Sequence, residues 1–202
     1  MIAVIDYGVG NLFSLISSLQ YLGLEAKVTG SADEIHTADR IILPGVGAFA
    51  DAMNKLRQTG LDTVIKEQAA SGKPLLGICL GMQVLFEKGL EYGEHDGLGL
   101  LKGEVVPILG DLKENLKIPH MGWNRLKITR NCPLLKHSKN GDYVYYVHSY
   151  YAKNCAESVA AVSDYGIDIT GVVVNGNVMG TQFHPEKSGE TGLNILSAFG
   201  EL

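Results

Sequence analysis

Short apolar runs alternate with amphipathic segments of helical length through the first ninety residues of the chain. Residues 2–5, 40–43 and 74–78 are strand-length apolar runs, and residues 25–28 suit a further strand. Residues 12–22 and 48–70 have helical spacing, with Gly23 as a stop signal and Gly60 as a break. Ser31 and Glu34 fit a capping box for a short helix. Strands separated by helices predict βαβ units and a parallel sheet.

The second half of the chain has a different pattern. Residues 172–179 predict a β-hairpin with Asn175-Gly176 at its turn, and residues 143–151 read as one strand rich in aromatic and β-branched residues. Residues 193–199 suit a closing helix. We therefore expect a three-layer, flavodoxin-like α/β fold, with a mostly parallel open sheet and an antiparallel extension in the C-terminal half. No linker or repeat is visible, so residues 1–202 are expected to form a single domain.

Composition and charge narrow the classes of function. The chain has 202 residues and a net charge of −5, without a cluster of Lys and Arg, so nucleic acid is not an expected partner. No signal peptide or membrane-length apolar stretch is visible. The three cysteines form neither a disulfide framework nor a metal-binding set, which favours a reducing cytoplasm and no metal. Residues 6–11 do not complete a dinucleotide fingerprint, because residue 13 is Phe, and we expect no cofactor.

Cys79 lies where an apolar strand meets a helical pattern. It is centred in Gly77-Ile78-Cys79-Leu80-Gly81, and residues 80–86 continue with helical spacing. A cysteine on a sharp strand-to-helix turn needs neighbours without a Cβ, as in a nucleophile elbow. The helix start after it favours thiolate over thiol. The motif predicts a nucleophile, and a cysteine merely packed at a tight turn is the alternative.

His184-Pro185-Glu186 supplies the groups that a nucleophilic thiol needs. In an extended segment, side chains two positions apart point to the same side, so His184 and Glu186 would face one site. An imidazole base requires a carboxylate that fixes its tautomer. Taken alone, the tripeptide would more often be a strand exit with a solvated Glu. Paired with Cys79, it predicts a Cys-His-Glu triad.

Three further motifs allow two interpretations each. Pro44-Gly45-Val46-Gly47 is either a plain turn or an oxyanion hole in which the Gly47 amide, with Val46 reorienting, acts together with the Leu80 amide. His120 and His148 lack metal-ligand spacing, so structural roles are expected. Trp123 reads most simply as a core aromatic, and as a partner-binding anchor in the alternative.

Several segments together resemble one protein family. They are Asp6-Tyr7-Gly8 with Gly10-Asn11, Pro44-Gly45-Val46-Gly47-Ala48-Phe49, Gly77-Ile78-Cys79-Leu80-Gly81-Met82-Gln83, Pro119-His120-Met121-Gly122-Trp123-Asn124, Val147-His148-Ser149-Tyr150 and Gln182-Phe183-His184-Pro185-Glu186-Lys187-Ser188. The chain resembles the class I, or triad, glutamine amidotransferases. Within them it is most similar to the glutaminase subunits of imidazole glycerol phosphate synthases. Met82 and the Pro119–Asn124 run carry the narrower likeness.

The resemblance implies a function and a partner. A glutaminase subunit would hydrolyse glutamine and deliver ammonia to a separate (β/α)₈-barrel synthase subunit in a heterodimer of histidine biosynthesis. It implies that Gln83, Glu91, Ser149 and Tyr150 bind glutamine. Candidates for the partner interface are Asn11, Trp123 and Asn124.

Other classes of function stay open at this point. They are the glutaminase of another synthase, a free-standing cysteine γ-glutamyl hydrolase and a non-catalytic flavodoxin-like module. Alkylation of Cys79 by a glutamine-like electrophile separates either enzyme from the module. A free-standing hydrolase would turn over without a partner.

Overall fold

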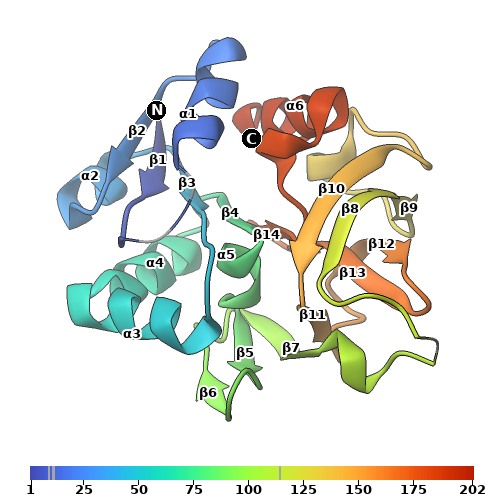
Figure 1. Cartoon of the computed structure of the whole chain (residues 1–202). Coiled ribbons are helices and arrows are strands. Elements are labelled where there is room, and N and C mark those ends of the chain that lie inside the picture. Colours follow the sequence, from blue (N-terminus) through green and yellow to red (C-terminus); the bar gives the residue numbers. More distant parts are fainter. Residues whose placement is uncertain (9, 11, 114) are drawn as a thin grey trace.

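The computed structural model describes residues 1–8, 10, 12–113 and 115–202. Its main sheet has eight strands in the order β2-β1-β3-β4-β14-β13-β12-β9 (Figure 1). The first five strands in this order run parallel and the rest antiparallel, as the sequence predicts. The strands are β1 (Ile2–Ile5), β2 (Ala26–Thr29), β3 (Arg40–Leu43), β4 (Leu75–Ile78), β9 (Lys127–Ile128), β12 (Val159–Asp164), β13 (Asp168–Asn175) and β14 (Val178–Thr181).

Helices cover both faces of this sheet (Figure 1). Side chains of α1 (Leu12–Tyr21) and α6 (Gly189–Gly200) pack with Ile2 and Val4 of β1 in one core. Those of α2 (Ala32–Thr37), α3 (Phe49–Thr59) and α4 (Leu61–Ala70) pack with Ala3 and Ile5 in the other. Successive residues of a strand face opposite sides, so each strand contributes to two cores. The result is the expected three-layer arrangement.

Two smaller sheets lie beside the antiparallel half, and the sequence pattern did not predict them. One has the order β11-β7-β5-β6 and the other pairs β10 with β8. Their strands are β5 (Phe86–Gly89), β6 (His95–Asp96), β7 (Leu101–Pro107), β8 (His120–Arg125), β10 (Tyr143–His148) and β11 (Tyr150–Lys153). Single 3₁₀ turns occur at η1 (Ile108–Gly110), η2 (Pro133–Leu135) and η3 (Pro185–Lys187). Among the described helices, none has the length and apolar character needed to cross a membrane.

Three local predictions are wrong. The helix expected over residues 80–86 is only α5 (Leu80–Gln83), because Phe86 pairs with β7 instead. Ser31 makes no side-chain cap to α2, and its own N–H donates to the Thr29 hydroxyl. The strand expected over residues 143–151 is divided at Ser149 into β10 and β11, which join different sheets. The hairpin at 172–179 is confirmed, but its two-residue loop is Gly176-Asn177 and not the expected Asn175-Gly176, because Asn175 still pairs with Val178 and Gly176 takes the positive φ of 59°.

Candidate active site

Cys79 occupies a sharp turn between β4 and α5. Its backbone has φ 55° and ψ −112°, a left-handed conformation that is strained for any residue with a Cβ. The chain folds back so tightly that a Cβ on Gly81 would lie 1.8 Å from the Leu43 carbonyl oxygen, and one on Gly77 would lie 2.6 Å from the Gly81 oxygen. The elbow expected from the two flanking glycines is therefore present.

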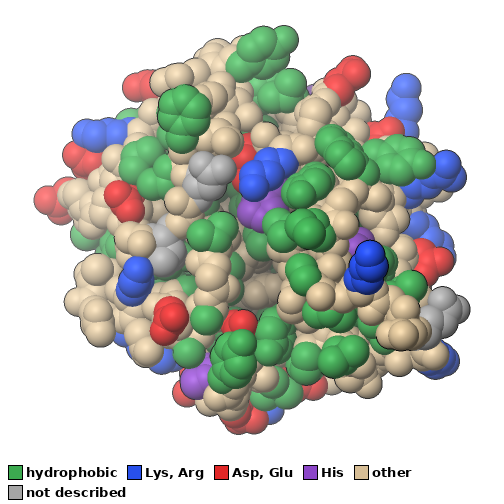
Figure 2. All heavy atoms as spheres, viewed as in Figure 1, with side chains coloured by type: hydrophobic (Ala, Val, Ile, Leu, Met, Phe, Trp, Pro, Cys, Tyr) green, Lys and Arg blue, Asp and Glu red, His purple; other side chains and the backbone are tan. Residues whose placement is uncertain are grey.

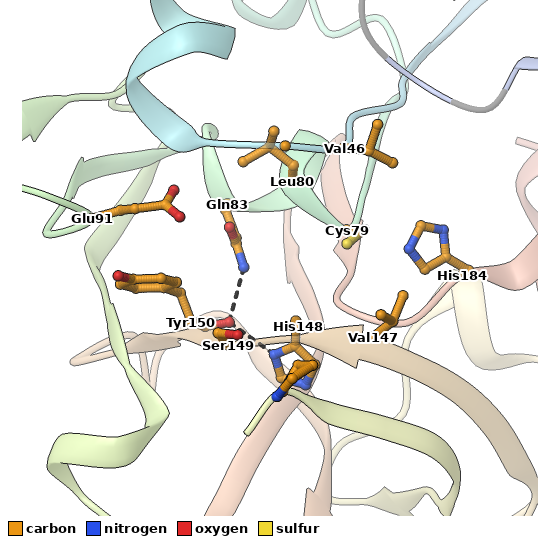
Figure 3. A pocket seen from close by; sticks show the side chains of 12 residues that line it. Val46, Cys79, Leu80, Gln83, Glu91, Val147, His148, Ser149, Tyr150 and His184 are labelled. Atoms are coloured by element: carbon orange, nitrogen blue, oxygen red, sulfur yellow. Dashed lines mark hydrogen bonds between the residues drawn. The ribbon is translucent and has the colours of Figure 1, made fainter. Parts of the chain in front are cut away.

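The topology brings His184 next to Cys79. Cys79 follows β4 and His184 lies shortly after β14, and these two strands are parallel neighbours. Figure 3 shows the imidazole and the sulfur facing each other across the same cavity. The Nδ1 atom of His184 lies 2.8 Å from Oε1 of Glu186, and the two side chains are only 5% and 4% exposed. The other ring nitrogen, Nε2, is therefore available to the thiol.

Opposing effects act on the charge of His184. Burial lowers its pKa, but the contacts with Cys79 and Glu186 outweigh burial and raise it to about 10. The site therefore favours the protonated, imidazolium form of His184. An imidazolium beside a cysteine favours the nucleophilic form of the sulfur.

A cavity of about 390 Å³ opens at Cys79 and His184. The residues that were predicted to bind substrate or to form the oxyanion hole all line it, namely Val46, Gly47, Leu80, Gln83, Glu91, Ser149 and Tyr150 (Figure 3). Glu186 lies behind His184 instead, against a small separate cavity. Pro119, Val147 and His148 also line the main cavity. Sequence reasoning had placed none of these three in the site.

The Pro44–Gly47 segment passes over the elbow. Gly47 has φ +99°, which favours glycine, whereas a Cβ on Gly45 would lie 2.7 Å from the Tyr7 hydroxyl. That hydroxyl donates to the Pro44 carbonyl over 3.0 Å. Burial, followed by the negative charge at Cys79, raises the pKa of Tyr7, so the hydroxyl stays protonated. Tyr7 thus supports this segment, a role that its turn motif did not predict.

Two residues expected to bind substrate are already held by the protein. The side-chain nitrogen of Gln83 donates to the Tyr150 carbonyl at 2.9 Å and to Oε1 of Gln182 at 3.0 Å. Oε2 of Glu91 accepts the Phe49 N–H at the start of α3, at 2.7 Å. Figure 3 shows the Glu91 carboxylate and Gln83 on the same side of the cavity. A carboxylate there suits a cationic group of a ligand.

His120 and His148 have the structural roles expected of them. Both are buried, and Nδ1 of His120 lies 2.9 Å from Nε2 of His148. Burial lowers the pKa of His120 to about 4 and that of His148 to about 3. Both rings are therefore neutral near pH 7.

The core interpretation of Trp123 is wrong. His120 and Asn124 of β8 turn inward, whereas Trp123 turns outward and is 56% exposed beside Met121, which is 62% exposed. In the space-filling view, hydrophobic side chains gather over β8 and β10 beside a central hollow (Figure 2). Asn124 is half-buried and donates to the Asp164 carbonyl. Asn11, the third predicted interface residue, lies outside the described residues.

Comparisons with known proteins agree with this geometry. The family model described as "Glutamine amidotransferase class-I" matches residues 3–200. The imidazole glycerol phosphate synthase subunit HisH of Caldanaerobacter subterraneus subsp. tengcongensis is 54% identical, covering 100% of this chain and 98% of the relative. The HisH protein of Listeria monocytogenes serotype 4a is 50% identical, with coverages of 100% and 96%.

Solved structures share the fold at low sequence identity. A crystal structure of a glutamine amidotransferase superimposes with a TM-score of 0.76 at 20% identity, covering 99% of this chain and 100% of that one. PurLQS from Thermotoga maritima gives a TM-score of 0.75 at 22% identity, with coverages of 98% and 96%. With the family model spanning nearly the whole chain and curated relatives at half identity or more, this chain belongs to the class I glutamine amidotransferases, in the family of the HisH subunits of imidazole glycerol phosphate synthase.

Proposed function

We propose that this chain hydrolyses the side-chain amide of glutamine to glutamate and ammonia, and passes the ammonia to a (β/α)₈-barrel synthase subunit. That partner would make imidazole glycerol phosphate and aminoimidazole carboxamide ribotide in histidine biosynthesis. The observation that carries the proposal is the elbow Cys79 facing His184, whose ring is held by Glu186 at 2.8 Å. The names of the HisH relatives support the synthase and its pathway.

The reaction follows from these three groups. The Cys79 sulfur attacks the amide carbon, and a tetrahedral intermediate forms. His184 gives its proton to the leaving nitrogen as the C–N bond breaks, which leaves a γ-glutamyl thioester and ammonia. His184 then takes a proton from water, whose oxygen attacks the thioester, and glutamate leaves as the sulfur regains its charge. Glu186 keeps the ring oriented and stabilises the imidazolium.

The remaining lining residues suit the rest of the substrate. The Leu80 N–H is at the first position of α5, where no intrahelical acceptor exists, and with the Gly47 N–H it would bind the oxyanion. Gln83 uses both amide hydrogens within the protein, so it offers the substrate only Oε1, an acceptor for the α-ammonium group. Glu91 would bind the same ammonium, and Ser149 and Tyr150 the α-carboxylate.

A partner is chemically reasonable because ammonia released into water would be protonated and lose its nucleophilicity. The exposed Trp123 and Met121 are candidates for that contact. Asn124 and Asn11 are the other two residues expected there from the sequence. We also propose that residues 1–202 form a single domain, since β1 and β14 belong to one sheet. The three free cysteines support a cytoplasmic location.

Substitution of Cys79 by Ala tests the proposal. In a complex of this chain with the barrel subunit, Cys79→Ala should abolish glutamine-dependent product formation and leave synthesis from added ammonium salts intact. Glutaminase activity that survives the substitution would show that Cys79 is not the nucleophile. Rapid turnover by the isolated wild-type chain would instead favour a free-standing γ-glutamyl hydrolase.

A further inference from the structure

Gln182 is a buried polar residue that the mechanism above does not use. Its side chain is fully buried just beyond β14, two positions before His184. Its Nε2 atom lies 3.8 Å from the Cys79 sulfur, a long but normal separation for a hydrogen bond to sulfur. Its Oε1 atom accepts a hydrogen bond from Gln83 at 3.0 Å. The residue therefore joins the nucleophile to a side chain of the substrate cavity.

The direction of these hydrogen bonds is set by the Tyr150 carbonyl, which can only accept. Because Gln83 approaches this oxygen at 2.9 Å, the NH₂ group of Gln83 must face it. The second hydrogen of the same NH₂ group then reaches Oε1 of Gln182. The Gln182 amide is thereby oriented with its own NH₂ group toward the sulfur.

A second chain of hydrogen bonds, which runs from Asn124 through His120 and His148, ends on the same carbonyl oxygen and is called the histidine arm below. Nδ1 of His148 lies 2.8 Å from the Tyr150 oxygen, so it must carry a hydrogen and Nε2 must accept (Figure 3). Nδ1 of His120 therefore donates to that Nε2 at 2.9 Å. Nε2 of His120 is left to accept from the Asn124 side chain at 3.3 Å. Every proton position follows from the one before, provided that both rings are neutral.

The low pKa values of the two histidines meet that condition. Protonation of His148 would put an N–H on Nε2, facing the N–H of His120, and protonation of His120 would put an N–H on Nε2, facing the NH₂ group of Asn124. Either change would break a hydrogen bond of the histidine arm. Burial opposes it, since it lowers the pKa of His120 to about 4 and that of His148 to about 3. The histidine arm runs from half-buried Asn124, next to exposed Trp123, to the wall of the cavity.

We propose that Gln182 is a catalytic residue whose amide N–H binds and stabilises the Cys79 thiolate, and that Gln83, which shares the Tyr150 carbonyl with His148, is a positioning residue that keeps this amide directed at the sulfur. The proposal rests on Cys79 being the nucleophile of the proposed function. A hydrogen bond to a charged group in a buried site changes the equilibrium constant for forming that charge by about tenfold to a hundredfold. Gln182 should stabilise the thiolate by that factor.

The test is the pH dependence of Cys79 alkylation by iodoacetamide, followed by mass spectrometry of the Cys79 peptide. The thiolate is the reactive form, so the pH midpoint reports its stability without glutamine or the partner. Gln182→Met keeps the length of the side chain and removes the donor. Its midpoint should move upward by about one to two pH units, and glutamine-dependent kcat in the complex should fall about tenfold to a hundredfold.

Gln68→Met is the matched control, because Gln68 is also buried but bonds to His36, away from the cavity. It should leave both the midpoint and kcat unchanged. Gln83→Met removes the donor that orients Gln182 but leaves the Gln182 amide in place, so in the absence of glutamine it should shift the midpoint upward by a smaller amount. If Gln182→Met does not fold, the pH midpoint of Cys79 alkylation in Gln83→Met tests the proposal instead.

An unshifted midpoint in Gln182→Met, or in Gln83→Met when the first variant is unfolded, would overturn the inference. The proposed function would survive that outcome, since its nucleophile is tested separately, by the glutamine-dependent activity of Cys79→Ala.

Discussion

At the scale of single residues, Glu186 determines how His184 is protonated. The two side chains are almost completely buried and lie 2.8 Å apart. Water cannot screen the carboxylate in such a position, so its effect on the imidazole is strong. The carboxylate and Cys79 together keep the ring charged despite the cost of burial.

Glu186→Gln should lower the pKa of His184 from about 10, because it removes a negative charge that stabilises the imidazolium. The ring would then lose its proton at lower pH than in the wild type. A ¹⁵N NMR titration of labelled histidine measures this directly. We also expect kcat to fall less than in His184→Ala, which removes the base itself. An unchanged His184 titration in Glu186→Gln would contradict this role for the carboxylate.

Some of these residues could be predicted from sequence and others could not. The triad could be predicted because its members belong to two short motifs, whose local geometry follows from glycine and proline. These members are Cys79, His184 and Glu186. Gln182 contacts Cys79 only because β14 pairs with β4, and no local pattern indicates that contact. Trp123, the single tryptophan of the chain, reads most simply as a core aromatic from the sequence. In the structure, Trp123 lies on the face of β8 that points to solvent, and its side chain is therefore exposed.

At the scale of elements, the elbow between β4 and α5 is the least tolerant part of the site. Gly81 lies against the end of β3, so the turn can close only where position 81 has no side chain. This is a packing requirement of the backbone, separate from the chemistry of Cys79.

Gly81→Ala should therefore destabilise the protein by about 3 kcal/mol or more, since its Cβ would overlap the Leu43 carbonyl at 1.8 Å. Gly110→Ala is the matched control. A Cβ there would have no heavy atom within 4 Å, and we expect the free energy of unfolding to change by no more than about 0.5 kcal/mol. Denaturant unfolding measures both. Equal stabilities of the two variants would contradict the close packing of the elbow.

Element prediction succeeded where the pattern is local and failed where pairing is distant. The break between α3 and α4 at Gly60 follows from its left-handed backbone. By contrast, Phe86 continues the apolar spacing of α5, yet it enters β5 because β7 supplies a pairing partner. Ser149 divides a continuous strand pattern because β10 and β11 join different sheets. In both cases tertiary pairing overrides a local preference.

At the scale of the whole molecule, an apolar surface lies next to the mouth of the active-site cavity. Trp123 and Met121 are exposed on β8, and the neighbouring β10 contributes Val147 to the cavity wall. Exposed apolar side chains that adjoin a reaction centre are expected at a contact with a partner. Ammonia released from the cavity would be protonated in water, so a partner bound next to the cavity mouth would protect it.

Trp123→Ala should weaken binding of the proposed barrel subunit by at least about thirtyfold, the effect of losing an aromatic anchor of about 2 kcal/mol. Calorimetry of the two subunits would measure it. Tyr21→Ala is a control at an aromatic residue that is 79% exposed at the end of α1. It should alter the affinity by less than about threefold. Similar losses in both variants would argue against a specific anchor at Trp123.

The partner is also expected to control turnover. Rotation of the Val46–Gly47 peptide would turn the Gly47 N–H toward or away from the oxyanion, and the positive φ of Gly47 permits it. Gly45, in contrast, is required by its contact with Tyr7. Since one oxyanion donor contributes about a hundred- to thousandfold, the liganded barrel subunit should raise kcat by about that factor and change KM far less. Steady-state kinetics that show stimulation confined to KM would contradict a peptide flip.

The distance between Cys79 and His184 is fixed by the pairing of β14 with β4, although about a hundred residues lie between the two in sequence. The spacing between Cys79 and His184 depends on two adjacent parallel strands in register, Thr181 opposite Ile78. The segment between these strands supplies β9, β12 and β13 of the main sheet, residues of the cavity wall, the two small sheets and the outward-facing surface around Trp123. Substitutions on the outward face of β8, around Trp123, would therefore change the surface offered to a synthase and leave the spacing of Cys79 and His184 unchanged.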